Sequence, residues 1–217
     1  MIGILLLGLF LLLPQFLSRF YIYLFALIFA TGLLATSLNM VLGFGGMYQF
    51  HHAVFYGLGA YALALFATKS GLPLWAGYIL APVCSAALGL ALGLITVRLS
   101  KLYFGMLQIS LGSLVWAIVY RWYSFTGGDD GIHGIPVPDL IGSSTGAYYF
   151  NLIITGACLL LMYLIVNSPF GRVFQGIRDN PERCLAVGIN VRSQQLVGQT
   201  VAAFFAGVAG TLFVTVE

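Results

Sequence analysis

Hydrophobic residues occur along this chain in long runs, and short polar segments separate them. The runs lie near residues 2–17, 20–42, 53–69, 73–97, 102–123, 147–167 and 194–216. A helix needs about 20 mostly apolar residues to cross the hydrocarbon core of a bilayer. The pattern therefore predicts an all-α, polytopic transmembrane helix bundle of about seven spans, in a single domain over residues 1–217. The first and third runs are the shortest.

The composition supports a membrane protein over a soluble one. Hydrophobic residues make up 60% of the chain and charged residues only 7%, whereas soluble domains carry about 25% charged residues. The net charge of +3 comes from basic residues in short loops, so no single basic face suggests nucleic acid as a partner. The first run lacks a basic leader and a small-residue cleavage site, and we interpret it as a membrane helix rather than a signal peptide.

Loop charges predict the orientation. Segment 98–101 carries two basic residues and segment 172–192 carries four, whereas loop 124–146 has three Asp and no Lys or Arg. Because cytoplasmic loops are enriched in Lys and Arg, the first two segments are predicted to be cytoplasmic and the loop external. The N-terminus is then cytoplasmic. Arg19 and Lys69 fall outside as exceptions.

Small residues in two runs predict close helix packing. In 73–97 they recur every four positions, and the last run has two small-xxx-small pairs, Ala203 with Gly207 and Ala206 with Gly210. The first set is Gly77, Ala81, Ser85, Gly89 and Gly93. Small residues are common in any membrane helix, but five in register favour a face on which a neighbouring helix packs.

A short surface helix is predicted inside the charged segment. Asn180 is a suitable N-cap, Pro181 suits the first helical position, and Glu182 lies at the positive end of the helix dipole. Gly188 can end the helix because it tolerates positive φ. The helix should run from Pro181 to Val187.

This helix is too short to be stable alone in water. Its apolar residues, together with Ile177, need a surface to pack against: Leu185, Ala186 and Val187. Upstream, Pro169 is expected to break the preceding span. The segment is either a solvated loop with anchoring charges or a docking helix that fits a partner protein and carries motion into the membrane.

A glycine-rich stretch follows the second run. Gly43, Gly45 and Gly46 make a regular helix costly there, and irregular backbone at membrane depth is tolerated only inside protein or along a wet cavity. The stretch is therefore either a discontinuous helix beside a path through the membrane or a plain cytoplasmic turn. The candidate path residues are Gly45, Gln49, His51, His52, Gln108 and Ser110.

The polar members of this set have two interpretations. Gln108, Ser110 and Ser113 either face the path or make hydrogen bonds between helices. Adjacent residues of a helix point about 100° apart, so His51 and His52 are not expected to chelate one metal ion. His133 is expected in a solvated outer loop. No metal site, catalytic motif or proton-carrying acid within a span is predicted.

Four segments, in order, resemble one family. They are VLGFGGMYQFHHAVFYGLGAY (41–61), RLSKLYFGMLQISLG (98–112), TGGDDGIHGIP (126–136) and the charged segment 171–190 with its IRDNPER and GIN motifs. Together they resemble permease subunits of the branched-chain amino acid ABC importer family. One departure concerns the Ser-x-Gly-His pattern usual in that family, where this chain has Gln49 and His51 in place of Ser and Gly.

The resemblance implies partners and a location. Such an importer has two permease subunits, two cytoplasmic ATPases and a periplasmic or lipid-anchored substrate-binding protein, in a bacterial or archaeal inner membrane. Segment 171–190 corresponds to the cytoplasmic coupling loop. Its ATPase-coupling residues would be Arg178, Asp179, Asn180, Pro181, Glu182 and Gly188. The chain has no G-x-x-x-x-G-K-[ST] motif, so it needs no cofactor of its own and ATP would bind to the partner subunits.

The predicted function is therefore a permease subunit, not an enzyme, for branched-chain amino acids or related small polar solutes. The departure at Gln49 and His51 keeps urea and aromatic acids open as substrates. The alternative is a secondary transporter or channel that works without ATPases. Members of the family usually continue with further membrane helices beyond the position of Glu217, so the chain is expected to be either a fragment or a shortened member.

Overall fold

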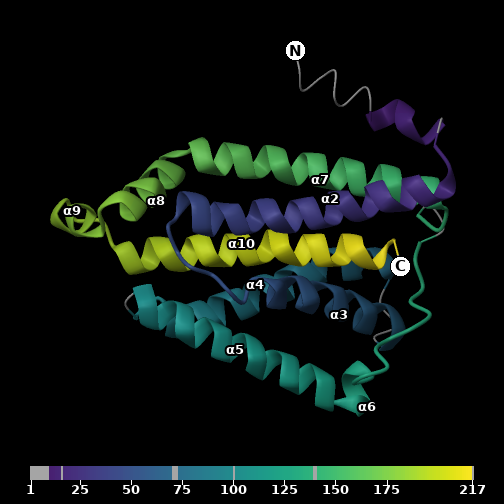
Figure 1. The fold of residues 1–217 in the computed structure, drawn as a ribbon, viewed down its shortest axis with the longest axis horizontal. Coiled ribbons are helices and arrows are strands. Elements are labelled where there is room, and N and C mark those ends of the chain that lie inside the picture. The colour runs from purple at the N-terminus through teal and green to yellow at the C-terminus, as the bar shows by residue number, and fades with distance from the viewer. Residues whose placement is uncertain (1–9, 16, 70–72, 100, 139–140, 217) are drawn as a thin grey trace.

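The computed structural model describes residues 10–15, 17–69, 73–99, 101–138 and 141–216, and every regular element in these ranges is helical (Figure 1). The elements are α2 (Arg19–Asn39), the π-helix η1 (Met40–Phe44), α3 (Ala53–Lys69), α4 (Leu74–Thr96), α5 (Lys101–Arg121), α6 (Tyr123–Thr126), α7 (Ser144–Asn167), α8 (Pro169–Asp179), α9 (Pro181–Ala186) and α10 (Val191–Val214). The predicted all-α bundle is confirmed.

Six of the seven predicted spans correspond to a helix. Within the described ranges, five helical segments are long and apolar enough to cross a membrane, namely α2 with η1, α4, α5, α7 and α10. The sixth, α3, has 17 residues and is about 25 Å long, slightly short for a full crossing. Most of the predicted first span, 2–17, lies outside the described residues, and residues 10–15 of it are helical.

Charged residues mark the two ends of the bundle. Segments 97–99 and 168–192 lie at one end, which we call the basic end, and loop 127–138 lies at the other, the acidic end (Figure 1). The helix α10 runs between the two ends in the middle of the bundle. It packs against α3 and α4 on one side and against α2 on the other, and α7 lies beyond α2.

The predicted small-residue face of α4 packs against α10. All five of its small residues are buried. A Cβ built at Gly89 would lie 2.5 Å from the Cβ of Ala203, and a Cβ built at Gly207 would lie 2.6 Å from the Cβ of Ser85. The helices can approach this closely only because neither carries a large side chain there. The predicted packing face is confirmed.

The helix α3 completes this interior, again through glycines. A methyl group at Gly59 would collide with the backbone of Gly207, and one at Gly210 would collide with the carbonyl oxygen of Tyr56. The Ser85 hydroxyl donates a hydrogen bond of 3.0 Å to the carbonyl oxygen of Phe55. Helices α3, α4 and α10 therefore form a tightly packed interior.

A buried asparagine joins the other half of the bundle to this interior. Asn151 of α7 donates to the carbonyl oxygens of Ala26 in α2 and Leu212 in α10, both at 3.2 Å, and it accepts from the Thr215 hydroxyl at 2.9 Å. Burying an amide is costly unless its hydrogen bonds are made. The register of α7 against α2 and α10 is thus specified by polar contacts as well as by packing.

Candidate functional site

The charged segment is a pair of helices rather than a loop. Ser168 ends α7 and caps α8, accepting a hydrogen bond of 3.3 Å from the backbone N–H of Gly171. Pro169 occupies the first turn of α8, where its missing N–H costs nothing. The predicted break at Pro169 is present, but a new helix starts there at once. The sequence predicted a helix only after Asn180 and did not predict α8, and α8 and α9 together are called the helix pair below.

The predicted helix after Asn180 is confirmed. The Asn180 side chain accepts a hydrogen bond of 3.0 Å from the N–H of Arg183, and Gly188 has φ +83°. The helix ends at Ala186, one residue before the predicted Val187. None of its residues is buried, and the side chains of Leu185 and Val187 are 58% and 75% exposed. Figure 1 shows α9 projecting beyond the basic end of the bundle.

An aromatic ring connects the helix α8 to the bundle. The ring of Phe174 lies between Gly45 and Gly198, and a methyl group at either glycine would collide with it. Phe170 stacks on Phe174 with ring centroids 5.6 Å apart. Ile177 is also buried, so its packing surface lies within this chain and not on a partner.

The side chain of Arg178 points toward η1. Its Nη1 donates a hydrogen bond of 2.9 Å to the carbonyl oxygen of Gly43 at the end of η1, and its Nε contacts Asp179 Oδ1 at 3.0 Å. A cation at a helix C-terminus is favourable because the last carbonyl groups carry partial negative charge. A Cβ built at Gly46 would lie 2.5 Å from Cγ of Arg178. Arg178 was predicted with the residues that meet an ATPase, yet the partners described here belong to its own chain.

The glycine-rich segment, residues 43–52, turns back into the bundle. Helix α2 passes into η1, Gly46 adopts φ +65°, and the chain then returns without regular structure to the start of α3 at Ala53 (Figure 1). Along this return the side chain of His52 reaches Ser37, which lies about 10 Å before the end of η1 along the helix axis. This geometry favours the discontinuous arrangement over a plain turn at the surface.

A buried polar cluster lies where the segment returns. His51 Nδ1 is 2.7 Å from Gln108 Oε1, His52 Nδ1 is 3.0 Å from Gln49 Oε1, and His52 Nε2 is 2.8 Å from the Ser37 hydroxyl. A neutral imidazole of His52 with its proton on Nδ1 donates to the Gln49 oxygen, which can only accept. Its Nε2 then accepts from the Ser37 hydroxyl, whose single proton is shared with the Leu34 carbonyl oxygen at 2.7 Å. All five side chains are buried.

The cluster retains unused hydrogen-bonding groups. Among the described residues, Gln49 Nε2, His51 Nε2 and Gln108 Nε2 are buried without a protein partner. Two amide nitrogens that can donate and one imidazole nitrogen that can accept therefore lie in one region of the bundle. Burying such groups without hydrogen bonds is costly, and water or a polar solute can form these bonds.

Four of the six predicted path residues join this cluster, and Gly45 and Ser110 do not. Gln49, His51, His52 and Gln108 meet, and Gly45 lies at the other end of the same segment against Phe174. Ser110 is exposed, and its hydroxyl bonds to the carbonyl oxygen of Met106 within its own helix.

Helix geometry explains why Ser110 is not part of the polar cluster. Residues two apart on a helix point about 200° apart, so Ser110 and Gln108 cannot face the same neighbour. Sequence reasoning also missed Ser37 and Phe174. The pattern of Phe170, Val173, Phe174 and Ile177, at i, i+3, i+4 and i+7, is typical of an amphipathic helix and could have identified α8.

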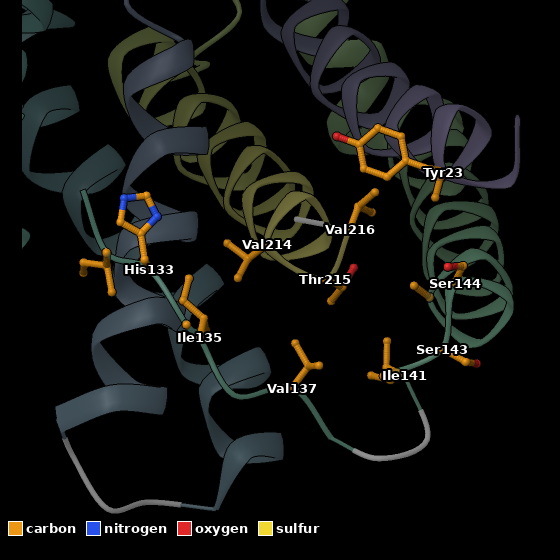
Figure 2. Close-up of a pocket in the computed structure, with 15 residues that line it drawn as sticks. Tyr23, His133, Ile135, Val137, Ile141, Ser143, Ser144, Val214, Thr215 and Val216 are labelled. Carbon is orange, nitrogen blue, oxygen red and sulfur yellow. The ribbon is translucent and has the colours of Figure 1, made fainter. Parts of the chain in front are cut away.

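A cavity of about 390 Å³ opens at the acidic end (Figure 2). Figure 2 shows Ile135, Val137 and Ile141 of the acidic-end loop on one side, and Val214 of α10 with the next residue, Thr215, on the other. Its lining also contains Tyr23, His133, Ser143 and Ser144. The volume is within the range of about 300–1,000 Å³ of small-molecule sites. Polar and apolar atoms contribute about equally to the lining, which suits a small amphipathic solute.

These features define a class: a polytopic helical membrane protein with a polar segment that turns back into the bundle and a helix pair at its basic end. The family described as "Branched-chain amino acid transport system / permease component" matches residues 20–216, and the chain belongs to this family. The resemblance drawn from the four sequence segments is confirmed.

Curated relatives are similar over much of the chain. The high-affinity branched-chain amino acid transport system permease protein LivM of Escherichia coli (strain K12) is 29% identical over 208 residues, covering 83% of this chain and 49% of the relative. LivM of Salmonella typhimurium is 28% identical with the same coverage. The probable branched-chain amino acid transport permease protein LivM of Methanocaldococcus jannaschii is 25% identical over 145 residues, covering 62% of this chain and 41% of the relative.

The chain spans about half the length of the curated relatives it matches. No solved structure matches it.

Proposed function

We propose that this chain is a transmembrane permease subunit of a binding-protein-dependent ABC importer for branched-chain amino acids or related small polar solutes. It works in a bacterial or archaeal inner membrane beside a second, homologous permease. Two cytoplasmic ATPases drive it, and a periplasmic or lipid-anchored binding protein delivers the solute. The basic end is cytoplasmic and so is the N-terminus. Membership of the family and the names of the relatives support this proposal.

One observation carries the proposal: the apolar surface of α9. Leu185 and Val187 are exposed at the projecting tip of the helix pair, and nothing within the described chain covers them. A six-residue helix has little stability of its own, so a partner that packs against it would stabilise both. Asp179 and Glu182 lie exposed beside this surface and can meet basic groups of the partner.

The geometry suits transmission of motion. Closure of the ATPase pair would displace α9 together with α8, on which α9 packs. The bundle would respond because Phe174 and Arg178 hold α8 to it. The bundle would then change between outward-open and inward-open forms. The acidic-end cavity would receive the solute, and Gly45, Gln49, His51, His52 and Gln108 would lie along its route.

The ATP-independent alternative has no specific support in the structure. Ion-driven transporters often use acidic residues at membrane depth, and the spanning segments α2, α4, α5, α7 and α10 contain no Asp or Glu. The solute itself is proposed from the family, because the cluster has no charged side chain that would specify one.

Co-purification with the cognate ATPase tests the proposal. Replacing Asp179 and Glu182 by Lys should reduce the ATPase recovered with the permease by at least tenfold, because like charges would face the partner's basic groups. The matched control is Asp129→Lys with Asp130→Lys, two exposed acids in the external loop, which should leave ATPase recovery unchanged. Full recovery with the first double variant would contradict docking through α9. No recovery with the unaltered protein would favour the ATP-independent alternative.

A further inference from the structure

The helix α5 is attached to the bundle through one narrow stripe. Gly105, Gln108 and Gly112 share a helix face, and all three meet Phe50 or His51 of the glycine-rich segment. A Cβ built at Gly105 would lie 3.1 Å from the Phe50 ring, and one at Gly112 would lie 3.0 Å from Cβ of His51. Gln108 accepts the 2.7 Å hydrogen bond from His51.

The rest of α5 has few contacts. Among its described side chains only Phe104 and Gln108 are buried, together with Gly105. Large apolar residues along the helix, such as Trp116 and Ile109, are exposed. Figure 1 shows α5 at the edge of the bundle. By contrast, α10 is buried over most of its length. Of these two helices, α5 can move with less loss of packing.

The other end of the glycine-rich segment is held by the helix pair. Arg178 bonds the Gly43 carbonyl oxygen and covers Gly46, while the Phe174 ring fills the space beside Gly45. Displacement of α8 would therefore displace Gly43 to Gly46. Since residues 46–49 have no regular structure, the chain from Gly46 to His51 is a short tether between α8 and α5.

We propose that Arg178 and the His51–Gln108 hydrogen bond are positioning elements that transmit displacement of the helix pair to α5, and that α5 is the helix that moves in the transport cycle. This inference rests on the proposed function, because the displacement originates in the ATPase. It assigns Arg178 a role within its own chain. It also makes the loosely packed face of α5 the part of the bundle that rearranges.

The first test uses the full-length permease assembled with its ATPase, second permease and binding protein in liposomes. Arg178→Leu removes the hydrogen bond to Gly43 but keeps an aliphatic group over Gly46. Solute uptake should fall at least tenfold, while ATPase recovery and ATP hydrolysis stay within twofold of the unaltered complex. The control, Arg192→Leu, removes the same charge from an exposed position at the basic end and should retain uptake within twofold.

Two outcomes overturn the inference while the proposed function stands. Uptake by Arg178→Leu equal to that of Arg192→Leu would show that the Gly43 bond transmits nothing. Loss of the ATPase from the Arg178→Leu complex would show that this side chain contacts the partner. If the unaltered complex neither retains the ATPase nor transports with ATP, the proposed function fails and the inference fails with it.

The second test measures the motion of α5 directly. Cysteines at Leu114 of α5 and Leu160 of α7, both exposed, carry spin labels in a protein whose native cysteines are replaced. The distance between labels should shift on ATP trapping in the unaltered complex. His51→Ala and Gln108→Ala should each abolish the shift, and the double variant should behave like either single one.

His51→Asn retains an N–H donor near the position of Nδ1 and should restore the shift. A purely structural role for His51 would not predict this recovery. A shift that persists in both alanine variants would overturn the inference. An equal shift in the distance between labels, with the α5 label moved to the exposed Leu90 of α4, would also overturn the inference.

Discussion

Glycines allow close contact in two regions of this molecule, and their partners differ. In the α3–α4–α10 interior, Gly59 and Gly210 meet main-chain atoms of neighbouring helices. At the basic end, Gly45 and Gly198 meet the ring of Phe174. Main-chain atoms of a helix cannot move without breaking its hydrogen bonds, whereas a side chain can change its rotamer. The first region is therefore a fixed frame, and the second is a joint that can adjust.

The largest effect is expected at the fixed frame. Gly210→Ala would place a methyl group against the carbonyl oxygen of Tyr56. Overpacking costs about 1–3 kcal/mol where side chains can relax, and here the neighbour is main chain, so we expect a loss of about 3 kcal/mol or more. Thermal unfolding in detergent measures the loss. The matched control is Gly57→Ala, since a Cβ at Gly57 would meet nothing within 4 Å. Equal stability of Gly210→Ala and Gly57→Ala would contradict the assignment of Gly210 to a fixed frame.

The sequence predicts part of this fixed frame, because the small residues of α4 recur at a regular spacing. The small face of α4 repeats every four residues, and such a repeat specifies a helix face whatever packs on it. Likewise, Asn180 and Gly188 act through their own backbone geometry, so local sequence predicted α9 to within one residue. The resemblance to the family depended in part on the segment that contains α9.

The joint was less predictable because it depends on tertiary contacts. Pro169 was interpreted as a helix breaker, although it also suits the first turn of a new helix, which is where α8 begins. The direction of Arg178 depends on a carbonyl group 135 positions away along the chain. The cluster was predicted in part, since buried polar residues in apolar runs are conspicuous, but its pairings, and the exclusion of Ser110, required the helix orientations.

An intermediate effect is expected at the joint. Gly198→Ala should destabilise the helix pair by about 1–3 kcal/mol, because the Phe174 ring must move. Adding Phe174→Leu should recover part of the loss, since the smaller side chain leaves room for the methyl group. Labelling of Cys184 by a maleimide reports loosening of α8 against α9, because this thiol is half-buried beside Gly176 of α8 and becomes more exposed when α8 shifts.

The labelling experiment needs the other two cysteines, Cys84 and Cys158, replaced by alanine. Labelling should be faster in Gly198→Ala and slower again in the double variant. If Phe174→Leu made the Gly198→Ala protein label faster still, the ring would be stabilising the joint in a way that its clash with position 198 does not explain.

The smallest effect is expected at the ion pair between Arg178 and Asp179. Both side chains are exposed, by 44% and 67%, and exposed pairs contribute about 0–1 kcal/mol. Asp179→Asn should therefore change the thermal stability of the isolated permease by less than Gly198→Ala does. Its small effect should shrink further as salt is added, because salt screens exposed charges. The hydrogen bond from Arg178 to Gly43 uses a different nitrogen from the contact with Asp179, so it should survive the change. A loss as large as that of Gly198→Ala would mean that Asp179 is needed to hold the guanidinium against η1. The adjustable joint would then depend on an acidic residue that a docked ATPase could reach and compete for.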